Sequence, residues 1–329
     1  MAKGVIKKLI SQQPSDCLPF IPLIYSYAAR LMQVPVRKML TNPTLLTKSI
    51  SMAYELFHPD VLVFPVDETL EAEALGAAVR YSSHAAPLIE QPALSSLDLP
   101  NEPVETHLQK GRLPLTFETL KRLKEQLGRE VDLLAGVTGP LTLAFQLRGK
   151  GLREDFLSNQ QEAMTFLEFV GQFITRIIRS YGELGVAGIL LVESRFSWVG
   201  LEMLSFLKSL IMPICNTCSY YEVPVIFYPD GIPSESRDFI ADLPWQGFIV
   251  NKPLEQGKLL KELSAKSRFV GLPLASDLLI NQPEATLLKD LEDFIPIGAA
   301  CGYFITTEGD LPLKIPAENI HYIRKCLNR

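Results

Sequence analysis

Eight short apolar segments, separated by longer helical patterns, constrain this chain more than any other feature of its sequence. Each is rich in Val, Ile, Leu or Phe, and none alternates with polar residues, which is typical of parallel strands buried on both faces. Eight β–α units in a chain of 329 residues predict an α/β fold, the closed (β/α)8 barrel. A doubly wound open sheet is the alternative. The segments are 18–24, 61–64, 131–137, 186–192, 223–228, 247–250, 268–272 and 302–305.

The sequence predicts one domain over residues 1–329, with an insertion-like region at 77–130 that holds a short hairpin, a loop and a charged helix at 116–128. No G-x-G-x-x-G motif follows the first strand, which disfavours a dinucleotide-binding fold. Further helices are expected at 44–57, 157–184, 201–221, 255–264, 283–292 and 316–327, the first of them beginning at Asn42-Pro43.

Composition excludes several classes of function. Hydrophobic residues make up 47% of the chain and the net charge is −5, so the chain can bury a core and has no basic stripe for nucleic acid. No apolar run reaches the length of a membrane helix, and the N-terminus lacks the apolar core of a signal peptide. Five cysteines in a long chain indicate reduced thiols, so we expect a cytoplasmic protein.

The second apolar segment, 61–64, is followed by four carboxylates within seven residues, the first of which is Asp67. Active sites of such barrels lie where the strands end at their C-terminal side, so Asp67 is expected to point into the mouth of the barrel. The later acids are expected in the wall of the cleft, in turn caps or in solvent. Tyr25 and Tyr27 follow the first strand and either line the pocket or pack against the barrel rim.

Cysteine and histidine offer weaker signals. Cys215 and Cys218 form a single C-x-x-C within a helical pattern, which favours buried cysteines over a metal or redox site. None of the four histidines follows a strand end, which disfavours a nucleophile triad.

Several motifs, in order along the chain, resemble the uroporphyrinogen decarboxylase superfamily. They are "PDVLVFPVDETLEAEALGAAVRY" (59–81), "GVTGPLTLAFQLRGKG" (136–151), the block that begins "GVAGILLVESRFSW" (185–198), "VPVIFYPDG" (223–231) and "GYFITTEGDLPLKIPAENIHYI" (302–323). The resemblance implies a (β/α)8 barrel, in agreement with the strand count. The superfamily includes tetrapyrrole decarboxylases and zinc-dependent methyltransferases that take methyl groups from corrinoids.

By this resemblance, Asp67 matches the aspartate that binds pyrrole N–H groups in the decarboxylases, and Ser194 also matches. The family's "RQAGR" stretch is "SYAAR" here, so Arg30 matches the second arginine while Ser26 replaces the first. Gln146 stands at the position of a family tyrosine. One arginine where two are expected argues against decarboxylation of a substrate with many carboxylates.

The methyltransferases bind zinc through His-x-Cys after the fifth strand and a Cys after the last. The corresponding residues here are Tyr228, Asp230 and Asp310, all oxygen donors that suit zinc poorly. We therefore expect no metal and no tightly bound cofactor. If the three side chains converge, they form an oxygen-rich cluster, in which one of the two carboxylates should have a raised pKa.

The resemblance implies an enzyme that acts on or beside a tetrapyrrole or corrinoid, with methyl transfer as the favoured reaction. A corrinoid would be its substrate or be carried by a partner protein. Porphyrinogen decarboxylation, and a non-catalytic barrel that binds a corrinoid protein or a small ligand, remain alternatives. The oligomeric state is left open. The residues expected at the site are Asp67, Ser194 and Tyr228 as catalytic groups, and Tyr25, Tyr27, Arg30, Gln146, Glu193, Asp230 and Asp310 as binding groups.

Overall fold

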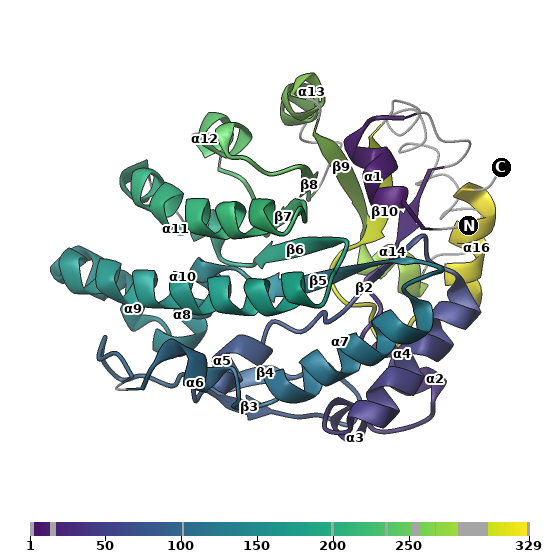
Figure 1. The fold of residues 1–329 in the computed structure, drawn as a ribbon, viewed down its shortest axis with the longest axis horizontal. Coiled ribbons are helices and arrows are strands. Elements are labelled where there is room, and N and C mark those ends of the chain that lie inside the picture. The colour runs from purple at the N-terminus through teal and green to yellow at the C-terminus, as the bar shows by residue number, and fades with distance from the viewer. Residues whose placement is uncertain are drawn as a thin grey trace.

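The computed structural model of the chain describes residues 3–13, 18–100, 102–198, 201–233, 236–251, 257–266, 268–281 and 302–327. Eight parallel strands form one sheet with the order β1-β10-β9-β8-β7-β6-β5-β2, which is a nearly closed barrel surrounded by helices (Figure 1). These strands are β1 Phe20–Ile21, β2 Val61–Val63, β5 Asp132–Thr138, β6 Gly188–Glu193, β7 Val225–Pro229, β8 Gly247–Ile249, β9 Phe269–Leu274 and β10 Tyr303–Thr307. The fold and all eight predicted strands are thus confirmed.

The helices of the described residues follow the β–α alternation. They are α1 Val5–Ile10, α2 Tyr27–Leu31, α3 Val36–Leu40, α4 Pro43–Phe57, α5 Leu70–Ala74, α6 Val104–His107, α7 Leu113–Leu127, α8 Pro140–Arg148, α9 Gly151–Ser158, α10 Gln160–Glu183, the 3-10 helix η1 Phe196–Trp198, α11 Leu201–Tyr220, α12 Arg237–Asp242, α13 Gly257–Ala265, α14 Ser276–Asn281 and α16 Ala317–Leu327. None of the helices described is long and apolar enough to cross a membrane.

One predicted helix is divided in the structure, and another lies outside the described residues. The predicted helix 157–184 is divided, because the Asn159 side chain accepts a hydrogen bond from the Glu162 amide and starts α10 afresh at Gln160. The predicted helix 283–292 lies outside the described residues. By contrast, α4 begins as expected, with Pro43 at its first turn and the Asn42 side chain accepting from the Leu45 amide at 2.9 Å.

The seam of the barrel lies between β1 and β2, and Asp60 closes it. The Asp60 amide donates to the Phe20 carbonyl at 2.9 Å, and the Asp60 carboxylate accepts from the Phe20 amide at 2.7 Å. Arg324 of α16 donates two hydrogen bonds to the same carboxylate. One carboxylate thus joins the first strand, the second strand and the last helix.

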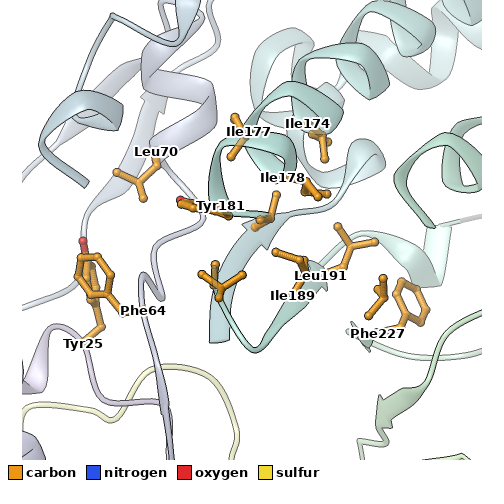
Figure 2. Packing of buried hydrophobic residues seen from close by; sticks show 14 of the residues in the cluster. Tyr25, Phe64, Leu70, Ile174, Ile177, Ile178, Tyr181, Ile189, Leu191 and Phe227 are labelled. Carbon is orange, nitrogen blue, oxygen red and sulfur yellow. The ribbon is translucent and has the colours of Figure 1, made fainter. Parts of the chain in front are cut away.

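Alternate residues of the strands pack into two separate layers. One layer fills the barrel interior and includes Ile6 and Leu9 of α1, which close its N-terminal end. The other layer lies between the strands and the helices; Figure 2 shows Ile174, Ile177 and Ile178 of α10 over Ile189 and Leu191 of β6. Because α1 covers one end of the interior, only the end where the strands finish remains for a ligand.

The region between β2 and β5 holds the predicted hairpin, formed by the antiparallel strands β3 Ala78–Arg80 and β4 Leu88–Gln91. The charged helix at its end is α7, which packs against α4. It therefore occupies the place of the barrel helix between β2 and β5, and the hairpin with α6 forms the added part.

Candidate active site

A cavity of about 920 Å³ lies at the C-terminal ends of the strands. Its floor is the top of the barrel interior, formed by inward-facing residues such as Leu190 of β6 and Tyr228 of β7. The hairpin β3–β4 and the end of α8 form its sides. A cavity of this size and position is a normal ligand site for the fold.

Six of the ten residues expected at the site line this cavity. They are Asp67, Gln146, Ser194, Tyr228, Asp230 and Asp310. Tyr228 lies near the end of β7, and the other five follow a strand or lie in the first helix after one, as the rule for barrel active sites requires.

Three of the other four expected residues, Tyr25, Tyr27 and Arg30, do not line the cavity. The ring of Tyr25 lies against Phe64, with 5.7 Å between the ring centroids (Figure 2). The Tyr27 hydroxyl donates to the Ile315 carbonyl at 2.9 Å. Arg30 donates to the carbonyls of Leu313 and Ile315, both at 2.6 Å. These side chains are therefore held in packing or backbone contacts, not at the cavity.

Glu193 is the fourth expected residue that does not line the cavity. It is buried at the end of β6, and its carboxylate accepts from the Thr142 amide in the first turn of α8 at 2.8 Å. Burial raises its pKa to about 8, against the hydrogen bonds from Thr142 that favour the ionised form. A Cβ on Gly139 would lie 2.5 Å from this carboxylate, which explains the glycine at the N-cap of α8.

Asp67 is held by a buried arginine that the sequence analysis missed. Arg112, just before α7, donates to one Asp67 oxygen at 2.5 Å, while the amide and the hydroxyl of Thr69 donate to the other oxygen at 2.9 and 2.6 Å. The Asp67 side chain is only 1% exposed. Arg112 lies 45 residues from Asp67 in the sequence, and no local pattern connects the two.

The same arginine holds a second acid of the stretch that follows β2. Arg112 donates to Glu73 at 2.7 Å, and the Tyr81 hydroxyl of the hairpin donates to the other oxygen of Glu73. The Arg112 guanidinium also lies 5.1 Å from the centre of the Tyr81 ring. This network, Asp67–Arg112–Glu73–Tyr81, fixes the hairpin to the start of α7.

The two remaining acids of the stretch, Glu68 and Glu71, have different environments. Glu71 is 1% exposed, not in the wall or in solvent as expected, and it accepts from the Thr138 amide at 3.1 Å and hydroxyl at 2.7 Å. Burial raises the pKa of Glu71 to about 7. Glu68 lines the cavity; burial raises its pKa, and a hydrogen bond with Ser194 acts in the opposite direction.

The positions that match zinc ligands in the resemblance do not form a donor set for zinc. Asp230 accepts from the amide and hydroxyl of Ser197 at 2.9 and 2.6 Å, and Asp310 accepts from the amides of Tyr25 and Ser26 at 2.8 and 2.9 Å. The Tyr228 hydroxyl accepts from the Gly309 amide at 3.2 Å.

Each of these three side chains thus accepts hydrogen bonds from a different part of the chain. Their ligand atoms are oxygens, and none of the three residues supplies a thiolate or an imidazole nitrogen for zinc. Across the described residues, no group of three or more His, Cys, Asp and Glu side chains could hold a metal ion. Asp310 does have a raised pKa, about 7, but its largest cause is burial, not the expected neighbouring carboxylate Asp230.

The two cysteines of the C-x-x-C motif are buried, as the sequence predicts. Cys215 and Cys218 are buried in α11, and burial raises the pKa of both thiols to about 12, so the C-x-x-C is part of the core.

Three cations at the cavity, Arg80, Lys150 and Arg195, were not anticipated. Arg80 and Lys150 lie in the hairpin and in the turn between two helices, where neither periodicity nor a barrel strand end indicates a site, whereas Arg195 directly follows Ser194 after β6.

Comparison with known protein families decides the relationship of this chain. The family model for uroporphyrinogen decarboxylase (URO-D) matches residues 2–329 of this chain. This chain belongs to the URO-D family. Among solved structures it resembles a methyltransferase from Methanosarcina mazei with a TM-score of 0.84 at 18% identity, over 98% of this chain and 97% of the other. That likeness shows the same barrel.

Curated relatives fall into two groups within the family. The methylcobamide:CoM methyltransferase MtaA of Methanosarcina barkeri is 30% identical over 109 residues, 32% of each chain. The match to these methyltransferases thus spans about a third of their length. The uroporphyrinogen decarboxylase of Sulfurimonas denitrificans is 22% identical over 288 residues, 81% of this chain and 77% of that one.

Proposed function

We propose that this chain takes part in corrinoid-linked methyl transfer, with a corrinoid as its substrate or as the group carried by a partner protein. The methylcobamide:CoM methyltransferases share higher identity with it, 30% over 109 residues, than the decarboxylases, 22% over 288 residues. The family itself consists of enzymes of both kinds, so the comparison alone does not separate the two reactions.

The observation that carries the proposal is the position of Arg30. The resemblance to the decarboxylases gives this residue the role of holding substrate carboxylates. Its guanidinium instead donates to the Leu313 and Ile315 carbonyls, and it does not line the cavity. Since Ser26 replaces the other arginine, neither member of that pair supplies a cation to a polycarboxylate substrate.

Three side chains of the cavity are proposed to act on the bound corrinoid or the methyl acceptor. Tyr228 accepts from the Gly309 amide, so its hydroxyl hydrogen can be donated to a ligand. Ser194 lies beside Glu68 at the end of β6 and offers a second hydroxyl. Asp67 is held in a fixed orientation by Arg112 and Thr69, and it orients a hydrogen-bond donor of the ligand.

The proposal does not include zinc. Both carboxylates at the corresponding positions already accept hydrogen bonds from amide groups, and oxygen donors suit zinc poorly. Elemental analysis of protein purified without an affinity tag or chelator checks this. One equivalent of zinc that disappears in an Asp230→Ala, Asp310→Ala double variant would show that these residues hold the metal with a new ligand set.

Anaerobic titration with hydroxocobalamin and methylcobalamin tests the function. We expect a change in the corrinoid absorption spectrum at micromolar to millimolar ligand, and weaker binding in a Tyr228→Phe variant. Tyr220→Phe is a matched control because Tyr220 is 80% exposed on α11 and does not line the cavity. Absence of binding at millimolar ligand would refute the proposal. Binding without loss of the methyl group to any thiol would identify a non-catalytic corrinoid-binding barrel.

Decarboxylation of a carboxylated tetrapyrrole is the second candidate. It is favoured by the decarboxylase matches over 81% and 87% of this chain and by the presence of Asp67 at the cavity. Incubation with uroporphyrinogen, followed by chromatography of the oxidised products, separates the two candidates. Unchanged octacarboxylate excludes decarboxylation, whereas accumulation of products with fewer carboxylates excludes the methyl-transfer proposal as the main activity.

A further inference from the structure

Three positively charged side chains surround the mouth of the cavity and form what we call the cationic rim: Arg80, Lys150 and Arg195. They come from three separate elements, the end of β3, the turn between α8 and α9, and the loop after β6. All three are exposed, whereas the carboxylates on the floor are buried or half-buried. The rim is therefore the part of the cavity that a ligand meets first.

None of the three rim cations forms an ion pair with a described residue. This differs from the other arginines near the cavity: Arg112 pairs with Asp67 and Glu73, and Arg148 pairs with Asp155 at 2.7 Å. Glu68 is near enough to Arg195 for the cation to lower its pKa somewhat, although burial, the largest effect, keeps that pKa raised. Five carboxylates also line the cavity: Asp67, Glu68, Asp230, Glu308 and Asp310. The three cations, however, lie beside α8 and the hairpin, and cations without ion-pair partners attract an anion there.

The guanidinium of Arg195 is held in place by an aromatic ring. Its central carbon lies 4.4 Å from the centre of the Phe145 ring of α8. Stacking occupies the flat face of the guanidinium and leaves the N–H groups along its edge free for a ligand. Phe145 itself lines the cavity, so the edge is presented there.

The other two rim cations stand on parts of the chain that are fixed to each other. The Leu94 amide, after β4, donates to the Leu147 carbonyl of α8 at 2.9 Å. Pro92 packs against Gly149, so closely that a Cβ on the glycine would lie 3.0 Å from the proline ring. The hairpin that carries Arg80 is thus fixed to the turn that carries Lys150.

Two buried acceptors in the same cavity indicate which other groups the ligand brings. Gln146 and Asn251 line the cavity, and the buried side-chain oxygen of each has no hydrogen-bond partner among the described residues. An unpaired buried acceptor costs free energy, and rotation of either side chain toward the cavity would allow a ligand N–H or O–H to satisfy it. The cavity thus suits a ligand with donors on its inner side and negative charge on its outer side.

We propose that the cationic rim is an anion-binding subsite, in which Arg80, Lys150 and Arg195 bind a sulfonate, phosphate or carboxylate group of the ligand. This rests on the proposed function, because the anion would belong either to the small methyl acceptor or to an acid-bearing corrinoid. The chemistry of recognition is the same in both cases, and the two sources can be separated by experiment.

Binding of two matched ligand pairs, measured by calorimetry at low salt, tests the subsite. The thiol pair is 2-mercaptoethanesulfonate and 2-mercaptoethanol, which differ in the sulfonate. The corrinoid pair is dicyanocobyrinic acid and dicyanocobinamide, which differ chiefly in free carboxylates against amides. Because hydrogen bonds to charged groups are stronger than neutral ones, we expect the anionic member of one pair to bind at least about tenfold more tightly than the uncharged member. The pair that shows the preference identifies the source of the anion.

Variants assign the preference to the rim. The triple variant Arg80→Gln, Lys150→Gln, Arg195→Gln should lose the preference for the anionic member and should bind the uncharged member as before. Arg153→Gln, an exposed cation of α9 that does not line the cavity, is the control and should retain the preference. Equal affinity within both pairs, or a preference that survives in the triple variant, overturns the subsite.

The same data separate this inference from the proposed function. Binding of neither corrinoid, together with a rim-dependent preference for the sulfonate, would refute the corrinoid proposal and keep the anion subsite. Binding of dicyanocobinamide without any charge preference in either pair would support the corrinoid proposal and refute the subsite.

Discussion

Removal of the Arg112 guanidinium should destabilise the fold more than any other single change near the cavity. Arg112 is 6% exposed and pairs with Asp67, which is 1% exposed, and with Glu73, which is 19% exposed. Breaking a buried ion pair by deleting one partner costs about 3–5 kcal/mol, because a buried charge remains without compensation. Arg112→Met should therefore lower the unfolding free energy by about this amount, and Tm by about 2 °C for each kcal/mol.

Urea unfolding followed by circular dichroism measures the loss, with Arg122→Gln as the control. Arg122 lies on α7 and pairs with Glu118, but both side chains are 35% or more exposed, so its removal should cost less than about 1 kcal/mol. The double variant Arg112→Met, Asp67→Asn should recover at least about 1 kcal/mol of the loss, since the amide leaves no unpaired charge. A loss for Arg112→Met as small as that of the control would refute the role of this ion pair.

Four further changes test other parts of the structure. Burial raises the pKa of Glu71 and Asp310 to about 7 and of Glu193 to about 8, so the folded chain binds more protons than the unfolded chain above about pH 5, and the unfolding free energy should fall as pH rises from 5.5 to 8.5. Glu193→Gln should flatten this dependence and match or exceed the parent in stability at pH 8.5; an unchanged slope would contradict the assignment. Gly139→Ala should lower the unfolding free energy by about 1–3 kcal/mol, because its Cβ would lie 2.5 Å from the Glu193 carboxylate, and combination with Glu193→Asp should recover part of the loss. Iodoacetamide at pH 8 should leave Cys215 and Cys218 unlabelled in the folded protein and label both in urea, as peptide mass spectrometry can measure, because burial raises their pKa to about 12. Glu68→Gln should change corrinoid affinity in the spectral titration with little change in the urea midpoint, and the reverse pattern would assign Glu68 a structural role.

The barrel was predictable because every strand is a continuous apolar run. Parallel strands covered by helices on one face and by the barrel interior on the other need no polar alternation, and the residues of β5, β7 and β9 are all buried. The break at Asn159 was not predictable from periodicity, because it depends on the non-helical backbone of Asn159 and on the hydrogen bond that its side chain accepts from the Glu162 amide.

The lining of the cavity was predictable where it depends on strand ends, and less so where it depends on contacts between distant parts of the chain. Asp67, Ser194 and Tyr228 follow or end strands, and all three line the cavity. The direction of Arg30 depends on two carbonyls almost 300 residues away in the sequence, at Leu313 and Ile315, which the local pattern does not contain. Arg80 and Lys150 likewise come together at the cavity because the hairpin is fixed against α8.

The four acids after β2 have different hydrogen-bond partners, and these partners indicate which carboxylate a ligand can bind. Asp67 and Glu73 are both engaged by Arg112, and Glu71 is buried against Thr138 at the end of β5. These three join the stretch to α7, to the hairpin and to the neighbouring strand, so a ligand that took their hydrogen bonds would have to break the packing of the barrel mouth.

The Glu68 side chain differs from these three: it lines the cavity, it forms a hydrogen bond with Ser194 in the loop after β6, and the Arg195 guanidinium lies nearby. Of the acids in this stretch, Glu68 is thus the one whose carboxyl group can exchange a hydrogen bond with a ligand at little cost to the fold. Burial is the main cause of its raised pKa, and the entry of a cationic or N–H-bearing group would favour the ionised form and lower that pKa. Asp67, held by Arg112 and Thr69, can accept a further hydrogen bond from a ligand only in the orientation that these two residues fix.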